Sequence, residues 1–173
     1  GDLAATLAQS GVWSQHVVSI PDPSLMLPVG RSGRYVRIQL GDTNYLSLAE
    51  VRVFAQVTVP SGDNVALGKA ASQSSTWLGW EGPASAGRAV DGNSSGNWAD
   101  GSVTHTNLQT HPWWQVDLGE VYSEISGIEI WNRTDACQDR LDDFYVFVSD
   151  VPFVSGDLAA TLAQSGVWSQ HVV

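Results

Sequence analysis

The chain has 173 residues, a formal net charge of −10, a single lysine and a single cysteine. This length suits one domain with a sizeable core. The acidic balance argues against a nucleic-acid partner, because nucleic-acid binders carry a basic face, and it disfavours anionic lipid surfaces. One cysteine cannot form an intramolecular disulfide, and no apolar run reaches the length of a transmembrane helix.

Glycine-rich composition, eight tryptophans and the lack of long helical patterns predict an all-β sandwich or barrel. In chain order, residues 33–40 alternate apolar and polar side chains, which predicts a half-buried strand. Residues 46–54 predict a second strand. Residues 56–63 contain Pro, Ser and Gly in succession and predict a linker.

The middle of the chain predicts loops followed by further strands. Residues 84–90 favour a short helical turn, residues 91–93 (Asp-Gly-Asn) a tight turn, and residues 94–101 a polar loop around Trp98. Three more strands are predicted: residues 112–118, ending at the Gly119 turn, then residues 125–131 and 144–148. This order fits a jelly-roll or discoidin-like β-sandwich with its binding loops at one end.

The two ends of the chain are copies of each other. Residues 1–18 and 156–173 both read GDLAATLAQSGVWSQHVV, at an offset of 155 residues. The chain therefore represents a window on head-to-tail units of 155 residues, and engineering or a recent tandem duplication would explain the perfect identity. Because residues 64–69 look like the start of a domain, we expect a single circularly permuted domain. In it, residues 57–173 form the N-terminal part, residues 1–56 the C-terminal part, and residues 56–63 the joining linker.

One domain offers one place for the duplicated segment. The remaining copy would extend from the domain, pack elsewhere or exchange with a neighbouring molecule, which would produce a homo-oligomer by segment swap.

Residues 132–140 concentrate charged side chains after an apolar run. Arg133 and Asp135 alternate, so on an extended backbone they point to the same side, and a loop can fold Arg140 back toward them. Two guanidinium groups beside a carboxylate form a donor and acceptor array that could grip an uncharged polyol. The alternative is a surface loop whose charges pair with one another.

These residues resemble the motif of the F-type lectins, the fucose-binding fucolectin family. That motif is a histidine, then about two dozen residues, then Arg-x-Asp, four residues and an Arg or Lys. Here Arg133-Thr134-Asp135 and Arg140 match its second half, and 27 residues separate His105 from Arg133. Other segments that look like the family, and extend the resemblance over the whole repeating unit, are residues 33–37, 48–54, 64–67, 89–93, 102–106 and 112–118.

The resemblance implies that His105, Arg133 and Arg140 hydrogen-bond the hydroxyls and ring oxygen of α-L-fucose. It implies that Asp135 holds the arginines in place and that Trp98 forms an apolar wall for the 6-methyl group of the sugar.

Two further side chains belong to this expected sugar site. Trp80, or its neighbour Trp77, would contact further sugars of an oligosaccharide. The family often has paired cysteines at the positions of Ala136 and Cys137, and their disulfide packs against the sugar. Since only Cys137 is present, we expect it to act as a small apolar side chain, and binding to be weaker or differently selective.

The resemblance also implies a bound Ca²⁺. Oxygen ligands of the kind that Ca²⁺ requires would come from the side chains of Asp91, Asn93, Ser102 and Glu50 and from the carbonyls of Arg88 and Ala49. The ion would join the two pieces of the permuted domain.

The sequence thus predicts a secreted, calcium-dependent or calcium-stabilised lectin for L-fucose and fucosylated glycans that is not an enzyme and does not insert into membranes. A discoidin-like module for lipid or protein is the alternative. A glycoside-acting enzyme is a further one, because Asp135, Asp139, Asp142 and Asp143 supply carboxylates, although no spacing singles out a catalytic pair. A glycan on the Asn132 sequon would crowd the site, so we expect a source that does not glycosylate, such as a bacterium.

Overall fold

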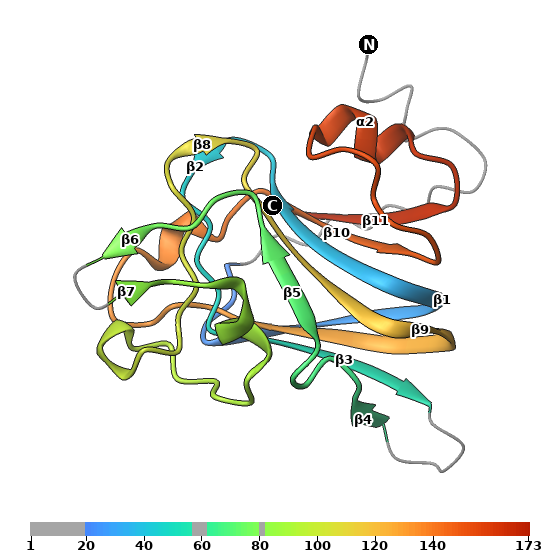
Figure 1. Ribbon diagram of the computed structural model, residues 1–173, viewed down its shortest axis with the longest axis horizontal. Coiled ribbons are helices and arrows are strands. Elements are labelled where there is room, and N and C mark those ends of the chain that lie inside the picture. The colour runs from blue at the N-terminus through green and yellow to red at the C-terminus, as the bar shows by residue number, and fades with distance from the viewer. Residues whose placement is uncertain (1–19, 57–61, 80–81) are drawn as a thin grey trace.

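The computed structural model describes residues 20–56, 62–79 and 82–173 and confirms the all-β prediction (Figure 1). Its principal strands are β1 (Ser24–Leu40), β3 (Glu50–Gln56), β4 (Gly62–Asn64), β5 (Ala70–Gln73), β9 (Trp113–Trp131), β10 (Phe144–Ser149) and β11 (Val167–Val172). Short pairs in the loops are β2 (Thr43–Asn44) with β8 (Gln109–Thr110) and β6 (Leu78–Gly79) with β7 (Gly82–Pro83). The helical elements are the 3-10 turns η1 (Ala86–Val90), η2 (Trp98–Asp100) and η3 (Gln138–Arg140), and helix α2 (Leu158–Ala163).

Two long strands, β1 and β9, run through both halves of the sandwich. Residues 24–28 of β1 pair with residues 127–131 of β9, whose other edge pairs with β3. Residues 35–40 of β1 pair with residues 113–117 of β9 on one side and with β10 on the other, and β11 follows β10. Shifts of register between Pro28 and Tyr35 mark the bend between the two halves.

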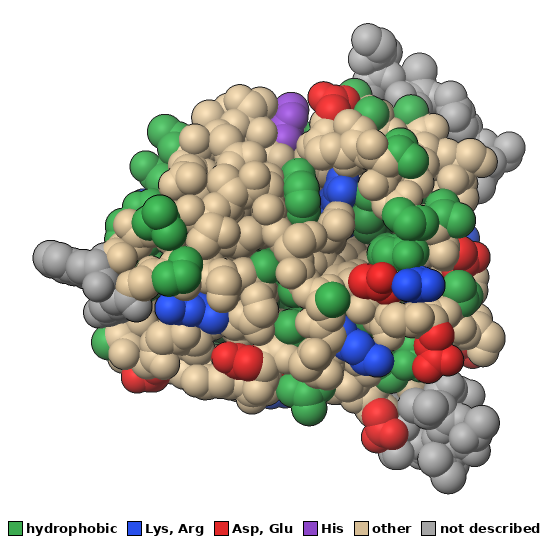
Figure 2. Space-filling view, viewed as in Figure 1, with side chains coloured by type: hydrophobic (Ala, Val, Ile, Leu, Met, Phe, Trp, Pro, Cys, Tyr) green, Lys and Arg blue, Asp and Glu red, His purple; other side chains and the backbone are tan. Residues whose placement is uncertain are grey.

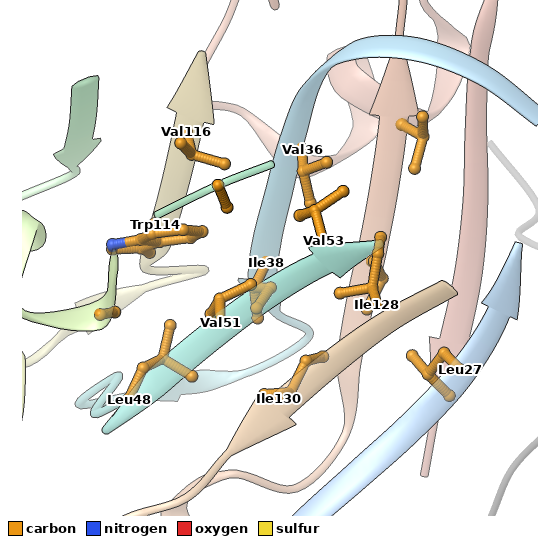
Figure 3. Close-up of a cluster of buried hydrophobic side chains, with 14 of the residues drawn as sticks. Leu27, Val36, Ile38, Leu48, Val51, Val53, Trp114, Val116, Ile128 and Ile130 are labelled. Carbon is orange, nitrogen blue, oxygen red and sulfur yellow. The ribbon is translucent and has the colours of Figure 1, made fainter. Parts of the chain in front are cut away.

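The core lies between these halves. Val36 and Ile38 of β1 meet Val51 and Val53 of β3, while Ile128 and Ile130 of β9 and Trp114 complete the cluster (Figure 3). All seven side chains are fully buried. The alternation of apolar side chains in each strand therefore produces one continuous core.

Two predicted strands differ in extent from the structure. The strand of residues 112–118 does not end at Gly119: Gly119 takes a positive φ of 91° within β9, and Asp117 Oδ1 accepts a hydrogen bond from its N–H. The strand predicted over residues 46–54 begins only at Glu50, because threonine side chains take the backbone N–H groups that precede it. Thr106 Oγ1 accepts from Leu46 N at 2.9 Å, and Thr104 Oγ1 accepts from Leu48 N at 3.0 Å.

The prediction that residues 33–40 form a half-buried strand is wrong at its polar positions. Arg37 is 2% exposed and Gln39 is fully buried. The segment that follows β10 covers them, because its carbonyls at Ser155 and Gly156 accept hydrogen bonds from Arg37 and Gln39. Residues 156–173, the second copy of the duplicated segment, thus fill a place in the fold, while the first copy lies outside the described residues.

No helix in the described ranges is long and apolar enough to cross a membrane.

Candidate functional site: a loop cluster at one end of the sandwich

Three long connections meet at one end of the sandwich (Figure 1). One joins the end of β1 to β3, the second joins β5 to β9, and the third joins β9 to β10. The strand ends Leu40, Trp113 and Phe144 lie at this end, because Leu40 pairs with Phe144 and Gln39 with Trp113. The antiparallel order therefore brings together residues 41–49, 74–112 and 132–143, which carry the predicted site.

Arg133 and Asp135 point to the same side, as their alternation predicts. Arg133 Nε donates to Asp135 Oδ1 at 2.7 Å, and Nη2 donates to Oδ2 at 2.9 Å. This bidentate pair holds the pKa of the Asp135 carboxyl below its usual value, through the hydrogen bonds from Arg133 first and with help from the Trp98 backbone N–H. Arg133 and Asp135 thus pair with each other, as the alternative of a surface loop with internal ion pairs predicted. This pairing fixes the direction of the Arg133 guanidinium.

Arg140 lies against His105. Arg140 Nη1 donates to His105 Nε2 at 3.2 Å, while His105 Nδ1 donates to the Thr106 carbonyl at 2.6 Å. These partners define the neutral tautomer with its proton on Nδ1. Burial lowers the pKa of His105, and the charges of Arg140 and Arg133 lower it further. His105 Nε2 is therefore an acceptor whose single lone pair is occupied by Arg140, so this histidine fixes the direction of the Arg140 guanidinium.

Aromatic rings surround His105. Its ring centroid lies 5.2 Å from Tyr45, 5.4 Å from Trp77 and 5.7 Å from Trp98. The two tryptophans contact each other edge to face at 5.5 Å. Arg133 lies 5.1 Å from the Trp98 ring and Arg140 4.6 Å from the Tyr45 ring. The structure thus brings the predicted Trp98 together with Arg133 and His105.

Tyr45 was missed by sequence reasoning. It follows an irregular stretch without periodicity and lies far from His105 in the chain. The contact forms because residues 46–48 pair with residues 104–106, with Thr106 N donating to Leu46 O at 3.0 Å and Thr104 N donating to Leu48 O at 2.8 Å. Only a prediction that residues 46–48 pair with residues 104–106 would have placed Tyr45 beside His105.

Two predicted sugar-binding residues remain, Trp80 and Cys137. Trp80 lies outside the described residues, and Trp77 occupies the place beside His105. Cys137 is a free, partly buried cysteine with a positive φ of 58° at the start of η3.

Asn132 of the glycosylation sequon is 2% exposed. Its Nδ2 donates to the carbonyls of Pro21 at 3.1 Å and Gln138 at 3.0 Å. A glycan is attached through this Nδ2, so the fold leaves no room for one at Asn132, and a source that does not glycosylate stays a prediction.

The predicted calcium ligands provide one unusual observation. Glu50, at the start of β3, is fully buried, and neither carboxylate oxygen has a hydrogen-bond partner. Burial raises the pKa of Glu50 to about 7, and the negative charge of nearby Asp91 raises it further. The Gly92 N–H lowers this pKa, although it makes no hydrogen bond to either carboxylate oxygen. A buried carboxylate without a partner is costly, so this one fits a bound cation.

The rest of the predicted ligand set lies in an ordered loop. Asp91 ends η1 and accepts from Asn93 N through Oδ1, and Asn93 Oδ1 accepts from Ser95 N. Ser102 is buried, and its hydroxyl donates to the Ser95 carbonyl. Arg88 belongs to η1 and Ala49 precedes Glu50, so their carbonyls come from the two segments next to Asp91 and Glu50. In the described part of the chain no three His, Cys, Asp or Glu side chains cluster, so the predicted set offers two carboxylates, Glu50 and Asp91, and its other ligands would be neutral oxygens.

Comparisons with known proteins agree with this fold and site. A family model described as a NedA-like, galactose-binding domain matches residues 88–167. The Fucolectin of Anguilla anguilla is 41% identical over 87 residues, covering 48% of this chain and 54% of that protein. Fucolectin-4 of Anguilla japonica is 40% identical over 96 residues, covering 53% of this chain and 52% of that protein. The Pentraxin fusion protein of Xenopus laevis is 37% identical over 55 residues, covering 32% of this chain and 13% of that protein.

The chain spans about half the length of the fucolectins it matches. No solved structure gives a significant match. The antiparallel β-sandwich agrees with a galactose-binding type of domain over the matched residues 88–167. Over about half of its length the chain is similar to the fucolectins, which are F-type lectins.

Proposed function

We propose that this domain binds L-fucose and fucosylated glycans without catalysis, at the loop cluster around His105. The observation that carries the proposal is the array of Arg133, Arg140 and His105 Nε2 beside the Trp98 ring. Fixed guanidinium donors suit the hydroxyl and ring oxygens of a neutral sugar, and an indole face suits its apolar methyl group. The relatives named fucolectins support this choice of ligand.

The charge distribution agrees with a neutral ligand. On the face shown in Figure 2, basic side chains lie beside acidic ones and form no continuous basic stripe. Within the site, Asp135 neutralises Arg133 through two hydrogen bonds. An anionic ligand would have to compete with this carboxylate, whereas a polyol can accept from the guanidinium groups without displacing it.

The hydrogen bonds of Asp135 and Asp143 support binding without catalysis. A glycosidase needs a protonated acid and a second carboxylate in reach of the same bond. Both oxygens of Asp135 accept from Arg133, which keeps the carboxyl ionised. Asp143 accepts from His171. Nitrophenyl-fucoside should therefore release no nitrophenol with the pure protein, and steady release would overturn the non-catalytic assignment.

We further propose that Ca²⁺ binds at Glu50, Asp91, Asn93 and Ser102 with the carbonyls of Arg88 and Ala49, and that the domain acts in the extracellular space, where glycans are displayed. The orphaned Glu50 carboxylate supports the ion. One site for a monosaccharide of about eleven heavy atoms should bind in the millimolar to high micromolar range. Useful affinity for cells would then require several sites.

The test of sugar choice compares L-fucose with L-galactose, its 6-hydroxy analogue, by titration calorimetry. If Trp98 faces carbon 6, L-galactose should bind about tenfold more weakly, because its hydroxyl loses water against an apolar wall. Trp98→Ala should narrow this difference. Equal binding of the two sugars by the parent protein would contradict the wall, and no binding of either would contradict the proposed function.

A further inference from the structure

The duplicated segment has a defined binding site on the domain. Residues 156–173 form α2 and β11, and β11 pairs with β10 from Phe144↔Val172 to Ser149↔Val167. Residues 1–18 have the same sequence. We propose that this segment site, formed by β10 and by residues 35–40 of β1, binds either copy, so that residues 1–18 replace residues 156–173 within the same chain.

The polar contacts of the segment site are specific. Arg37 is buried between the rings of Trp113 at 4.8 Å and Phe153 at 4.3 Å, and Nη1 donates to Thr161 Oγ1 at 2.9 Å. Gln39 Nε2 donates to the Gly156 carbonyl at 2.8 Å. At an offset of 155 residues, the partners in the first copy are Thr6 and Gly1. The first copy therefore repeats the acceptors at Thr161 and Gly156, whereas the Ser155 carbonyl, which also accepts from Arg37 at 2.6 Å, lies outside the duplicated segment.

The apolar contacts are repeated in the same way. Leu158 is 8% exposed, Trp168 5% and Val172 1%, and Leu158 packs with Tyr145 and Phe147 of β10. Asp157 caps α2 by accepting from Ala160 N at 2.8 Å. The first copy carries the counterparts of these four residues at positions 3, 13, 17 and 2. Both copies can thus bury the same surface with the same helix cap.

The first copy is attached where it can reach the site. It continues through Ser19 into the stretch before β1, where the Pro21 carbonyl accepts from Asn132 Nδ2. Asn132 begins the β9–β10 connection, whose other end is Phe144, the partner of Val172. The end of the second copy and the attachment of the first therefore lie at the same end of the sandwich.

Exchange within one chain is favoured over exchange between two molecules. A second molecule would bring a segment with the same contacts and no additional ones, yet association would cost translational and rotational freedom. A tethered copy competes at high effective concentration. The segment site should consequently be filled by one of two nearly equivalent segments in a monomer.

A crosslinking experiment tests the proposal on the full chain. Ser149 pairs with Val167, whose counterpart is Val12, and paired positions in antiparallel strands are close enough for a disulfide. In a Cys137→Ala background, Ser149→Cys with Val167→Cys is the control. Ser149→Cys with Val12→Cys should also form a disulfide within one chain under mild oxidation. A crosslink only between two chains, or none, would overturn the same-chain exchange.

A second experiment tests whether the two copies of the segment can substitute for each other. If both copies serve, Trp13→Ala or Trp168→Ala alone removes one of two equivalent states and lowers Tm by about 1 °C. The double variant has no intact copy and should lose about 10 °C. If Trp168→Ala alone lowers Tm as much as the double variant, the first copy does not fill the site and the proposal fails.

Discussion

His105 is the residue on which the donor and acceptor pattern of the site depends. It is 7% exposed and lies among three aromatic rings, with Arg140 donating to Nε2. Protonation would place a third positive charge beside Arg133 and Arg140 and would remove the acceptor. Burial and these two arginines therefore keep the imidazole neutral.

This state of His105 predicts the pH dependence of binding. Because its pKa in the folded protein is lowered from 6.5, fucose affinity should stay constant as pH falls to about that value and decrease only below it. The unfolded chain binds this proton first, so the contribution of His105 to stability should decrease as pH falls below its ordinary pKa and toward the lowered one; Glu50, whose pKa is raised to about 7, contributes in the opposite direction when no cation is bound. Asp135 does not interfere, since its pKa is lowered from 3.8.

Calorimetric titrations of fucose at a series of pH values above and below 6.5 check the prediction. His105→Gln is the control, and its fucose affinity should not decrease as pH falls below the ordinary histidine pKa. A loss of affinity in the parent protein that is already complete above 6.5 would mean that His105 is more basic than the structure implies.

At the scale of elements, the site depends on close contact between the Trp98 loop and the loop after β9. Thr134 N donates to the Gly96 carbonyl at 2.9 Å. A Cβ at Gly96 would lie 2.6 Å from Thr134 Oγ1 and 2.7 Å from the Asn132 carbonyl. The side chain of Thr134 could rotate away, but the backbone carbonyl cannot, so only glycine permits this contact.

Gly96→Ala should separate the two loops and move Trp98 from Arg133. We expect fucose affinity to fall at least about tenfold, with a loss of stability of about 1–3 kcal/mol. Gly87→Ala is the matched control, because a Cβ there meets nothing within 4 Å. Titration calorimetry and thermal unfolding of both variants provide the comparison, and equal fucose affinity in the two would show that the contact does not position the site.

The strands also show how much of the fold could be predicted from the sequence. Alternation found the strands through Val36 and Ile38, because one face of each must enter the core. It divided β9 into two strands, residues 112–118 and 125–131, because Gly119 bends a strand that continues. It also misjudged Arg37, whose burial depends on a segment more than a hundred residues later in the chain. At the site, the motif supplied His105, Arg133 and Arg140, whereas Tyr45 needed the pairing of residues 46–48 with 104–106.

At the scale of the whole molecule, Glu50 links two parts of the chain. It begins β3, which lies in residues 1–56, the C-terminal part of the permuted domain we propose, while Asp91 and Ser102 belong to residues 57–173, its N-terminal part. Its unpaired, buried carboxylate raises the free energy of the folded domain unless a cation is present. A calcium ion there would stabilise the pairing of the two pieces and order the loop that leads to His105.

Calcium should therefore raise the Tm of the parent protein, and a chelator should lower it. Glu50→Gln should remove this response, and in chelator the variant should be at least as stable as the parent, because it no longer buries an unpaired carboxylate. Asp63→Asn changes a carboxylate on β4 outside the proposed site and serves as the control. A Tm of the parent protein that does not respond to calcium would contradict the proposed metal site.

The most direct measurement for the central claim, sugar binding through the Arg133 array, is calorimetric titration of L-fucose into three proteins. They are the parent, Arg133→Ala and Arg34→Ala. Arg34 makes the same bidentate pair with Asp117, at 2.7 and 2.9 Å, away from the loop cluster. We predict equal binding by the parent and Arg34→Ala, and at least about tenfold weaker binding by Arg133→Ala. No heat with the parent protein, or unchanged affinity in Arg133→Ala, would contradict the account.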